Sequence, residues 1–141
     1  QAFLAKVRYN RLIDIFLGIT TYSLQNHLRT TVKGIGQIEI DELYVGIDKY
    51  GCHYIIPVQA KGGTDQISMV QTSQDTAWCE QKYPNVRCRA ISAQFVSSDL
   101  IALFELKIDE GQVKLIEERH YKLVPVKELD SSDISNYRMS V

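Results

Sequence analysis

Acidic, amide and ammonium groups recur at two-residue spacing on two strand-like segments in the middle of this 141-residue chain. The first segment alternates apolar residues with Glu39 and Asp41, and the second carries Gln59 and Lys61 near its end. Because successive side chains of a strand point to opposite faces, each of these two pairs shares one face. If the two faces coincide, a carboxylate, an amide oxygen and an ammonium group converge at the strand ends.

Such a convergence has a definite chemistry. Carboxylate and amide oxygens are ligands for hard divalent cations such as Mg²⁺, and a neighbouring lysine can polarise water or an anionic substrate. The alternative is a cross-strand ion pair between Asp41 and Lys61 on the surface, which would contribute little. The segments around both residues are mostly apolar, which favours a functional site.

The residues between the two segments indicate how they are joined. Residues 37–47 and 53–60 are rich in strand formers, and Asp48-Lys49-Tyr50-Gly51 separates them. Two such runs bridged by a glycine-containing turn predict a β-hairpin.

The rest of the chain predicts helices before and after this hairpin, followed by further strands. Apolar residues recur at helical spacing near the N-terminus, and Ser23 is a good N-cap for a second helix. A third helix ends near Tyr83, because Pro84 disfavours helix at the residue before it. The predicted elements are helices over residues 2–17, 23–33 and about 65–83, the hairpin, and strands over 86–96, 100–108 and 113–124.

The order helix, helix, strand, strand, helix, strand, strand, strand predicts an α+β fold with a central mixed β-sheet flanked by helices. We expect one domain, with N-terminal helices over residues 1–33, a core over residues 34–125 and a polar tail over residues 126–141. The chain begins with Gln1 rather than Met, as the C-terminal part of a longer protein would.

Composition narrows the function classes. Hydrophobic residues make up 45% of the chain, which indicates a globular protein rather than a disordered one. The formal net charge of −1 gives no overall attraction to nucleic acid, so a nucleic-acid site must be a local patch. No long apolar run predicts a membrane span. Three widely spaced cysteines, Cys52, Cys79 and Cys88, indicate free thiols and a cytoplasmic protein.

Together these motifs resemble the PD-(D/E)XK nuclease superfamily, which includes the restriction endonucleases. Asp41 matches the first acid of the family motif, and Gln59-Ala60-Lys61 matches its acid-x-Lys element. The resemblance spans roughly residues 23–104. It implies a restriction-endonuclease-like fold and a metal-dependent, restriction-type endonuclease that hydrolyses DNA phosphodiester bonds.

The resemblance also implies residue roles. Asp41, Gln59 and the backbone carbonyl of Ala60 would hold Mg²⁺, for which Mn²⁺ could substitute. Lys61 would orient or deprotonate the attacking water. The implied partner is double-stranded DNA, and cutting both strands favours a homodimer with two sites in symmetry.

Gln59 departs from the family pattern, because an amide brings no charge to the cation. Glu39 could supply the missing acid. Some members use a further acid from the preceding helix, but no acid lies between Asp14 and Glu39 here, so Gln25 or His27 could fill that place.

Two other side chains could assist. Gln71 could steady Lys61 or the phosphate, and Arg29 could contact the DNA backbone. The alternative function is a catalytically inactive nuclease-fold domain used for nucleic-acid binding or assembly, which the uncharged Gln59 favours.

Overall fold

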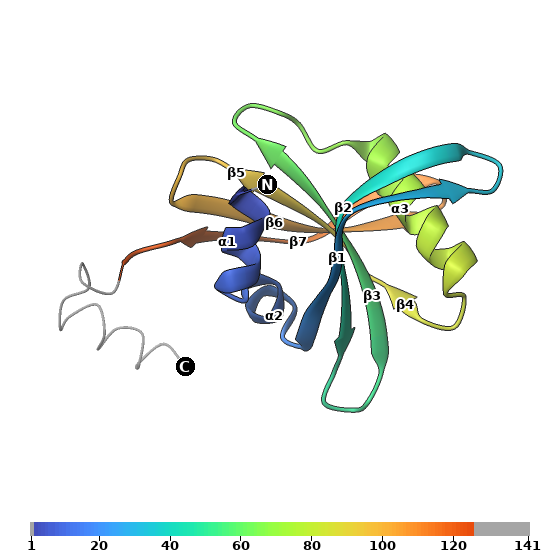
Figure 1. Cartoon of the computed structure of the whole chain (residues 1–141), viewed down its shortest axis with the longest axis horizontal. Coiled ribbons are helices and arrows are strands. Elements are labelled where there is room, and N and C mark those ends of the chain that lie inside the picture. The colour runs from blue at the N-terminus through green and yellow to red at the C-terminus, as the bar shows by residue number, and fades with distance from the viewer. Residues whose placement is uncertain (1, 126–141) are drawn as a thin grey trace.

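The computed structural model describes residues 2–125 of the chain. Within them, seven strands form one mixed sheet with three helices packed against it (Figure 1), which confirms the predicted α+β class. No helix in this range is long and apolar enough to cross a membrane. The predicted polar tail, residues 126–141, lies outside the described residues. The elements are α1 (Ala2–Tyr9), α2 (Leu12–Leu17), β1 (Thr20–Val32), β2 (Gly36–Ile47), β3 (His53–Gly62), α3 (Met69–Lys82), β4 (Arg87–Cys88), β5 (Ala90–Phe95), β6 (Leu100–Asp109) and β7 (Gln112–Lys122).

The strand order across the sheet is β1-β2-β3-β5-β6-β7, with the short β4 paired to β3. The β2–β3 hairpin is present as predicted, with its turn between Ile47 and His53. β3 and β5 run parallel, and α3 makes the crossover between them. All other neighbours along this order run antiparallel. The sheet is therefore mixed because of a single helical crossover.

The predicted helix over residues 23–33 is wrong, so only the first half of the segment 1–33, which was predicted to be helical, forms helices. Residues 23–32 lie in β1, which pairs along its length with β2. Leu24, Leu28 and Val32 recur every four residues as on a helix face, but Leu24 is 57% exposed, so they form no buried helical face. The threonines, Tyr22 and Val32 favour a strand conformation. Pairing with β2 then stabilises the strand, and the propensities of the segment's own residues cannot reveal that pairing. The element order therefore has an additional strand before the hairpin.

The first predicted helix is present as two shorter ones. Arg11 adopts a left-handed backbone conformation, with φ of 52°, and separates α1 from α2. Gly18 closes α2 in the same conformation, as its place in the sequence predicts.

Two hydrophobic cores lie on the two faces of the sheet. One joins α1 and α2 to the centre of the sheet through Leu4, Ile13, Tyr44 and Ile56, among others. The other lies beneath α3, where Trp78 and Cys79 pack on apolar residues of β1, β2 and β3. Each helical layer therefore covers one face of the sheet. The second core holds α3 over the polar residues that lie beneath it.

Candidate functional site

β2 and β3 separate from each other near Asp41 and Lys61, and we call this point the fork. Backbone pairing of the two strands runs from Ile47 and His53 as far as Glu42 and Val58. From there β2 continues along β1, while β3 continues along β5. Figure 1 shows the end of β3 and the β1–β2 ribbon diverging from the centre of the sheet. The fork leaves backbone groups of β3 free to meet side chains.

Asp41 fills this fork. Its Oδ2 accepts a hydrogen bond of 2.8 Å from the backbone N–H of Ala60, which takes the place of a ladder bond. The N–H and C=O of one strand residue point to the same side, so the Ala60 carbonyl also faces the fork. A carboxylate and a backbone carbonyl, both predicted ligands, are thereby brought together.

Gln59 lies beneath α3 and is only 2% exposed. Its Nε2 donates to Oγ1 of Thr72 at 2.6 Å, and its Oε1 accepts from the backbone N–H of Ser68 at 3.3 Å. Both ends of the amide are thus used to attach β3 to the start of α3.

The first turn of α3 also positions Gln71. Ser68 caps the helix, its hydroxyl accepting from the Gln71 N–H at 3.0 Å. Gln71 Nε2 then reaches Oδ2 of Asp41 at 3.5 Å, the outer limit for a hydrogen bond. The sequence prediction that Gln71 lies at the site is consistent with this contact, although its partner is Asp41.

Lys61 follows Gln59 by two residues on β3 and so projects toward the same face. Within residues 2–125, no ion pair engages its ammonium group. Its charge acts on Asp75 of α3, as does that of Asp41. Asp41 and Lys61 therefore belong to one electrostatic cluster.

Asp75 is the residue that the sequence interpretation missed. It is 2% exposed, and its Oδ1 has no hydrogen-bond partner in the described part of the chain. Burial raises the pKa of Asp75 to about 8; the negative charge of Asp41 adds to the rise and Lys61 opposes it. The sequence contained a signal for this residue, because Asp75 follows Gln71 by four residues and both therefore lie on one helix face.

The face of α3 that packs on the sheet is partly polar. Val70 is 67% exposed, whereas Thr72 and Asp75 are buried together with Trp78. Polar residues occupy the inner face at the helix start because the fork below them is polar.

Four other candidates lie elsewhere. Glu39 contacts His27 Nδ1 at 3.4 Å and Arg29 Nε at 3.8 Å on the β1–β2 ribbon. His27, Arg29 and Gln25 stand on β1 rather than on a helix before the hairpin, and all three are exposed. The structure therefore gives Glu39 basic neighbours of its own and assigns it no contact with Asp41.

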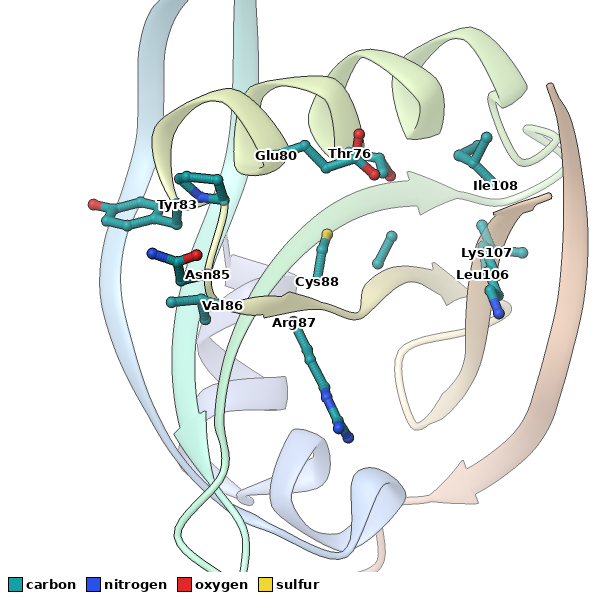
Figure 2. A pocket seen from close by; sticks show the side chains of 12 residues that line it. Thr76, Glu80, Tyr83, Asn85, Val86, Arg87, Cys88, Leu106, Lys107 and Ile108 are labelled. Carbon is teal, nitrogen blue, oxygen red and sulfur yellow. The ribbon is translucent and has the colours of Figure 1, made fainter. Parts of the chain in front are cut away.

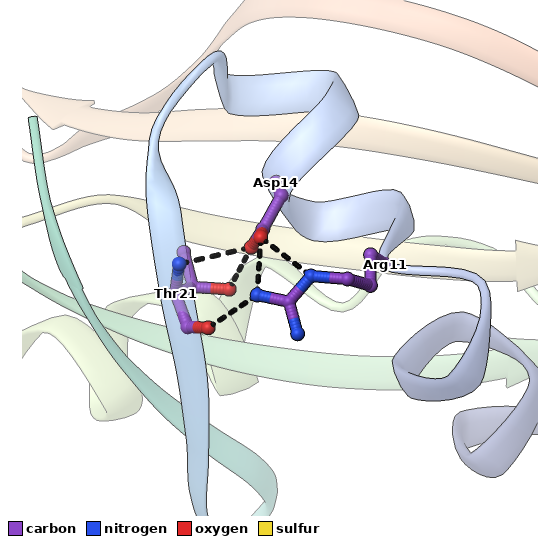
Figure 3. Close-up of polar contacts among 3 residues, drawn as sticks. All are labelled: Arg11, Asp14 and Thr21. Carbon is purple, nitrogen blue, oxygen red and sulfur yellow. Dashed lines mark hydrogen bonds and ion pairs between the residues drawn. The ribbon is translucent and has the colours of Figure 1, made fainter.

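Acids on the opposite face are engaged by the N-terminal helices. Glu42 is fully buried and receives two hydrogen bonds from Arg8, at 2.9 and 3.1 Å. Figure 3 shows Asp14 of α2 bonded to Arg11 and to the backbone and hydroxyl of Thr21. Asp14 thus fixes α2 to β1 and contributes nothing to the fork.

A separate pocket of about 550 Å³ lies at the other end of α3 (Figure 2). Thr76, Glu80, Cys88 and Lys107 are among the residues that line it. Neither Asp41 nor Lys61 borders it, so this hollow is distinct from the polar cluster at the fork.

The donors at the fork fit a hard cation. All hydrogen bonds that the described residues make to Asp41 end on Oδ2, which leaves Oδ1 for a ligand. The Ala60 carbonyl and the orphaned oxygen of Asp75 are further oxygen donors. Within residues 2–125 no three acidic, histidine or cysteine side chains gather at one point, so water would complete such a coordination shell.

Comparisons of the chain with protein-family models, with curated proteins and with solved structures give no match. The chemical role of the fork is therefore inferred from its geometry alone.

Proposed function

We propose that this chain is a Mg²⁺-dependent, restriction-type endonuclease that hydrolyses DNA phosphodiester bonds. The observation that carries the proposal is the fork itself: Asp41 from β2 and Lys61 from β3 face α3 where the two strands separate. The helices α1 and α2 before the consecutive strands β1, β2 and β3, and the helix α3 that crosses over to β5, support a restriction-endonuclease-like assignment.

Each residue has a role that its geometry supports. Asp41 and the Ala60 carbonyl would hold the cation, and Lys61 would orient the attacking water or screen the phosphate charge. A bound Mg²⁺ supplies Lewis acidity and a template for the reacting oxygens. Gln71, attached to Asp41, would keep that carboxylate in place.

The proposed substrate is double-stranded DNA. Beyond the fork, the β1–β2 ribbon carries Arg29, whose side chain is 85% exposed, and the exposed Lys33. A two-stranded ribbon fits the major groove, and such cations contact phosphates. Cleavage of both strands would need two copies in symmetry, so the proposal includes a homodimer. The free thiols support a cytoplasmic enzyme.

Plasmid cleavage tests this function directly. Wild-type protein with Mg²⁺ or Mn²⁺ should cut the plasmid, and Asp41→Ala and Lys61→Ala should each lower the rate by at least ~10²-fold, because each removes a group acting on the reacting phosphate.

Asp109→Ala and Lys49→Ala are matched controls, since both residues are exposed at turns and should leave the rate unchanged. Cleavage at the wild-type rate by folded Asp41→Ala protein would overturn the nuclease proposal.

One observation favours a second function. The Gln59 amide is used at both ends to attach α3, as expected of a fold retained for nucleic-acid binding or assembly without catalysis. Absence of both cleavage and Mn²⁺ binding, with DNA binding retained, would establish this alternative.

A further inference from the structure

Asp75 is buried in a way that the fold alone does not explain. The residue is 2% exposed on the inner face of α3, and among the described residues its Oδ1 meets no donor. A buried carboxyl oxygen without a partner destabilises the folded state, so packing by itself disfavours an acid at this position.

The neighbours of Asp75 are the residues of the fork. Thr72, three residues earlier, bonds Gln59, and Gln71, four residues earlier, bonds Asp41. Residues at these spacings share one helix face. Asp75 also lies close enough to Asp41 and Lys61 for both charges to act on it.

Gln59 cannot supply what a cation at this place needs. It carries no charge, and its Oε1 is already hydrogen-bonded to the N–H of Ser68. With Asp41 alone, a divalent cation would face one carboxylate and the ammonium of Lys61. A second acid is therefore the group missing from the donor set.

We propose that Asp75 supplies the second carboxylate of the cation site, so that α3 carries the charge that Gln59 lacks on β3. This inference rests on the proposed function, because it concerns the same site. The ligand class is a hard divalent cation, Mg²⁺ or Mn²⁺, between Asp41 and Asp75 with the Ala60 carbonyl. Binding would give the orphaned oxygen its partner and balance two acids against Lys61.

Calorimetric titration with Mn²⁺, without DNA, tests the assignment on intact protein. Asp75→Asn keeps the size of the side chain and removes its charge, so we expect Mn²⁺ affinity to fall by roughly tenfold or more. Glu80→Gln is the matched control, because Glu80 is an exposed acid on the same helix, and it should bind as wild type. Circular dichroism confirms that each variant is folded.

The double variant Gln59→Glu/Asp75→Asn sharpens the test. It moves the carboxylate from α3 back to β3, and we expect it to recover at least part of the lost affinity. If Asp75 had only a structural role, the double variant would not recover Mn²⁺ affinity.

The outcomes separate this inference from the proposed function. If Asp41→Ala weakens Mn²⁺ binding and Asp75→Asn does not, the Asp75 assignment is wrong and the site at Asp41 stands. If wild-type protein binds no Mn²⁺, or Asp41→Ala binds as tightly as wild type, both proposals fail.

Discussion

At the scale of single residues, the fork shows how two chemically similar acids acquire different properties. Asp41 is half-buried, and its Oδ2 accepts a hydrogen bond from the backbone N–H of Ala60. Asp75 is buried with an unpaired oxygen, and its pKa is raised to about 8, first by burial and then by Asp41. Metal-free protein therefore holds Asp75 largely protonated at neutral pH.

This protonation has a consequence for stability. The folded protein retains a proton on Asp75 at pH values where the unfolded chain, with an ordinary carboxyl pKa near 4, has released it. Stability should therefore fall as pH rises from about 4 toward about 8, by on the order of 1 kcal/mol per pH unit from this group.

Asp75→Asn removes this titration, so urea unfolding in EDTA at pH 5 and pH 8 should show a smaller loss of stability for the variant than for wild type. An identical pH dependence in the two proteins would show that Asp75 titrates normally.

At the scale of elements, the first turn of α3 connects the helix to the fork. Ser68 caps the helix through the N–H of Gln71, and its own N–H bonds Gln59. The cap therefore fixes the helix start and aims Gln71 at Asp41. Cap residues satisfy donors that helix geometry leaves free, so their loss is measurable.

Ser68→Ala should lower the free energy of unfolding by about 1 kcal/mol, because it removes the side-chain acceptor of the cap. Ser73→Ala is the control: Ser73 is exposed inside the same helix, where alanine is favourable. Chemical denaturation measures both variants, and equal stability of Ser68→Ala and wild type would show that the cap contributes nothing.

At the scale of the whole molecule, two layers hold the sheet from opposite faces. α3 covers the face with the candidate site, while α1 and α2 are attached to the other face by Arg8–Glu42 and Asp14–Thr21. Glu42 is fully buried, and its carboxylate accepts hydrogen bonds from Arg8 and from the hydroxyl of Ser23. The Arg8–Glu42 pair thereby links α1 to the strand that carries Asp41.

Arg8→Ala should destabilise the protein by about 3 kcal/mol, because it leaves the Glu42 carboxylate buried without its cation. Arg119→Ala breaks an exposed ion pair with Glu117 on β7 and should cost under about 1 kcal/mol. Thermal unfolding compares the two variants. Adding Glu42→Gln to Arg8→Ala should restore stability. If the double variant is no more stable than Arg8→Ala, the unpaired Glu42 carboxylate is not the cause of the lost stability.

The sequence by itself determined the features that depend on local chemistry. Alternating strand formers around a glycine-containing turn predicted the β2–β3 hairpin, and Pro84 predicted where α3 ends. The helix predicted over residues 2–17 ends where α2 ends. Two-residue spacing predicted that Gln59 and Lys61 share one face of β3, and the structure has both residues in that strand, with Gln59 bonded to Thr72 of α3. These predictions succeeded because turn geometry and strand periodicity are properties of neighbouring residues.

Only the tertiary structure decided the rest. Pairing with β2 made residues 23–32 a strand, and it carried His27 and Arg29 to the ribbon, beside Glu39. The fork that opens Ala60 to Asp41 arises because β3 stays paired with β5 on its other edge after its pairing with β2 ends at Val58. The position of β5 depends on the α3 crossover, which is distant in sequence from β2. Asp75 joins the site for the same reason, because the packing of α3 on the sheet places an acid from a later helix over an earlier hairpin.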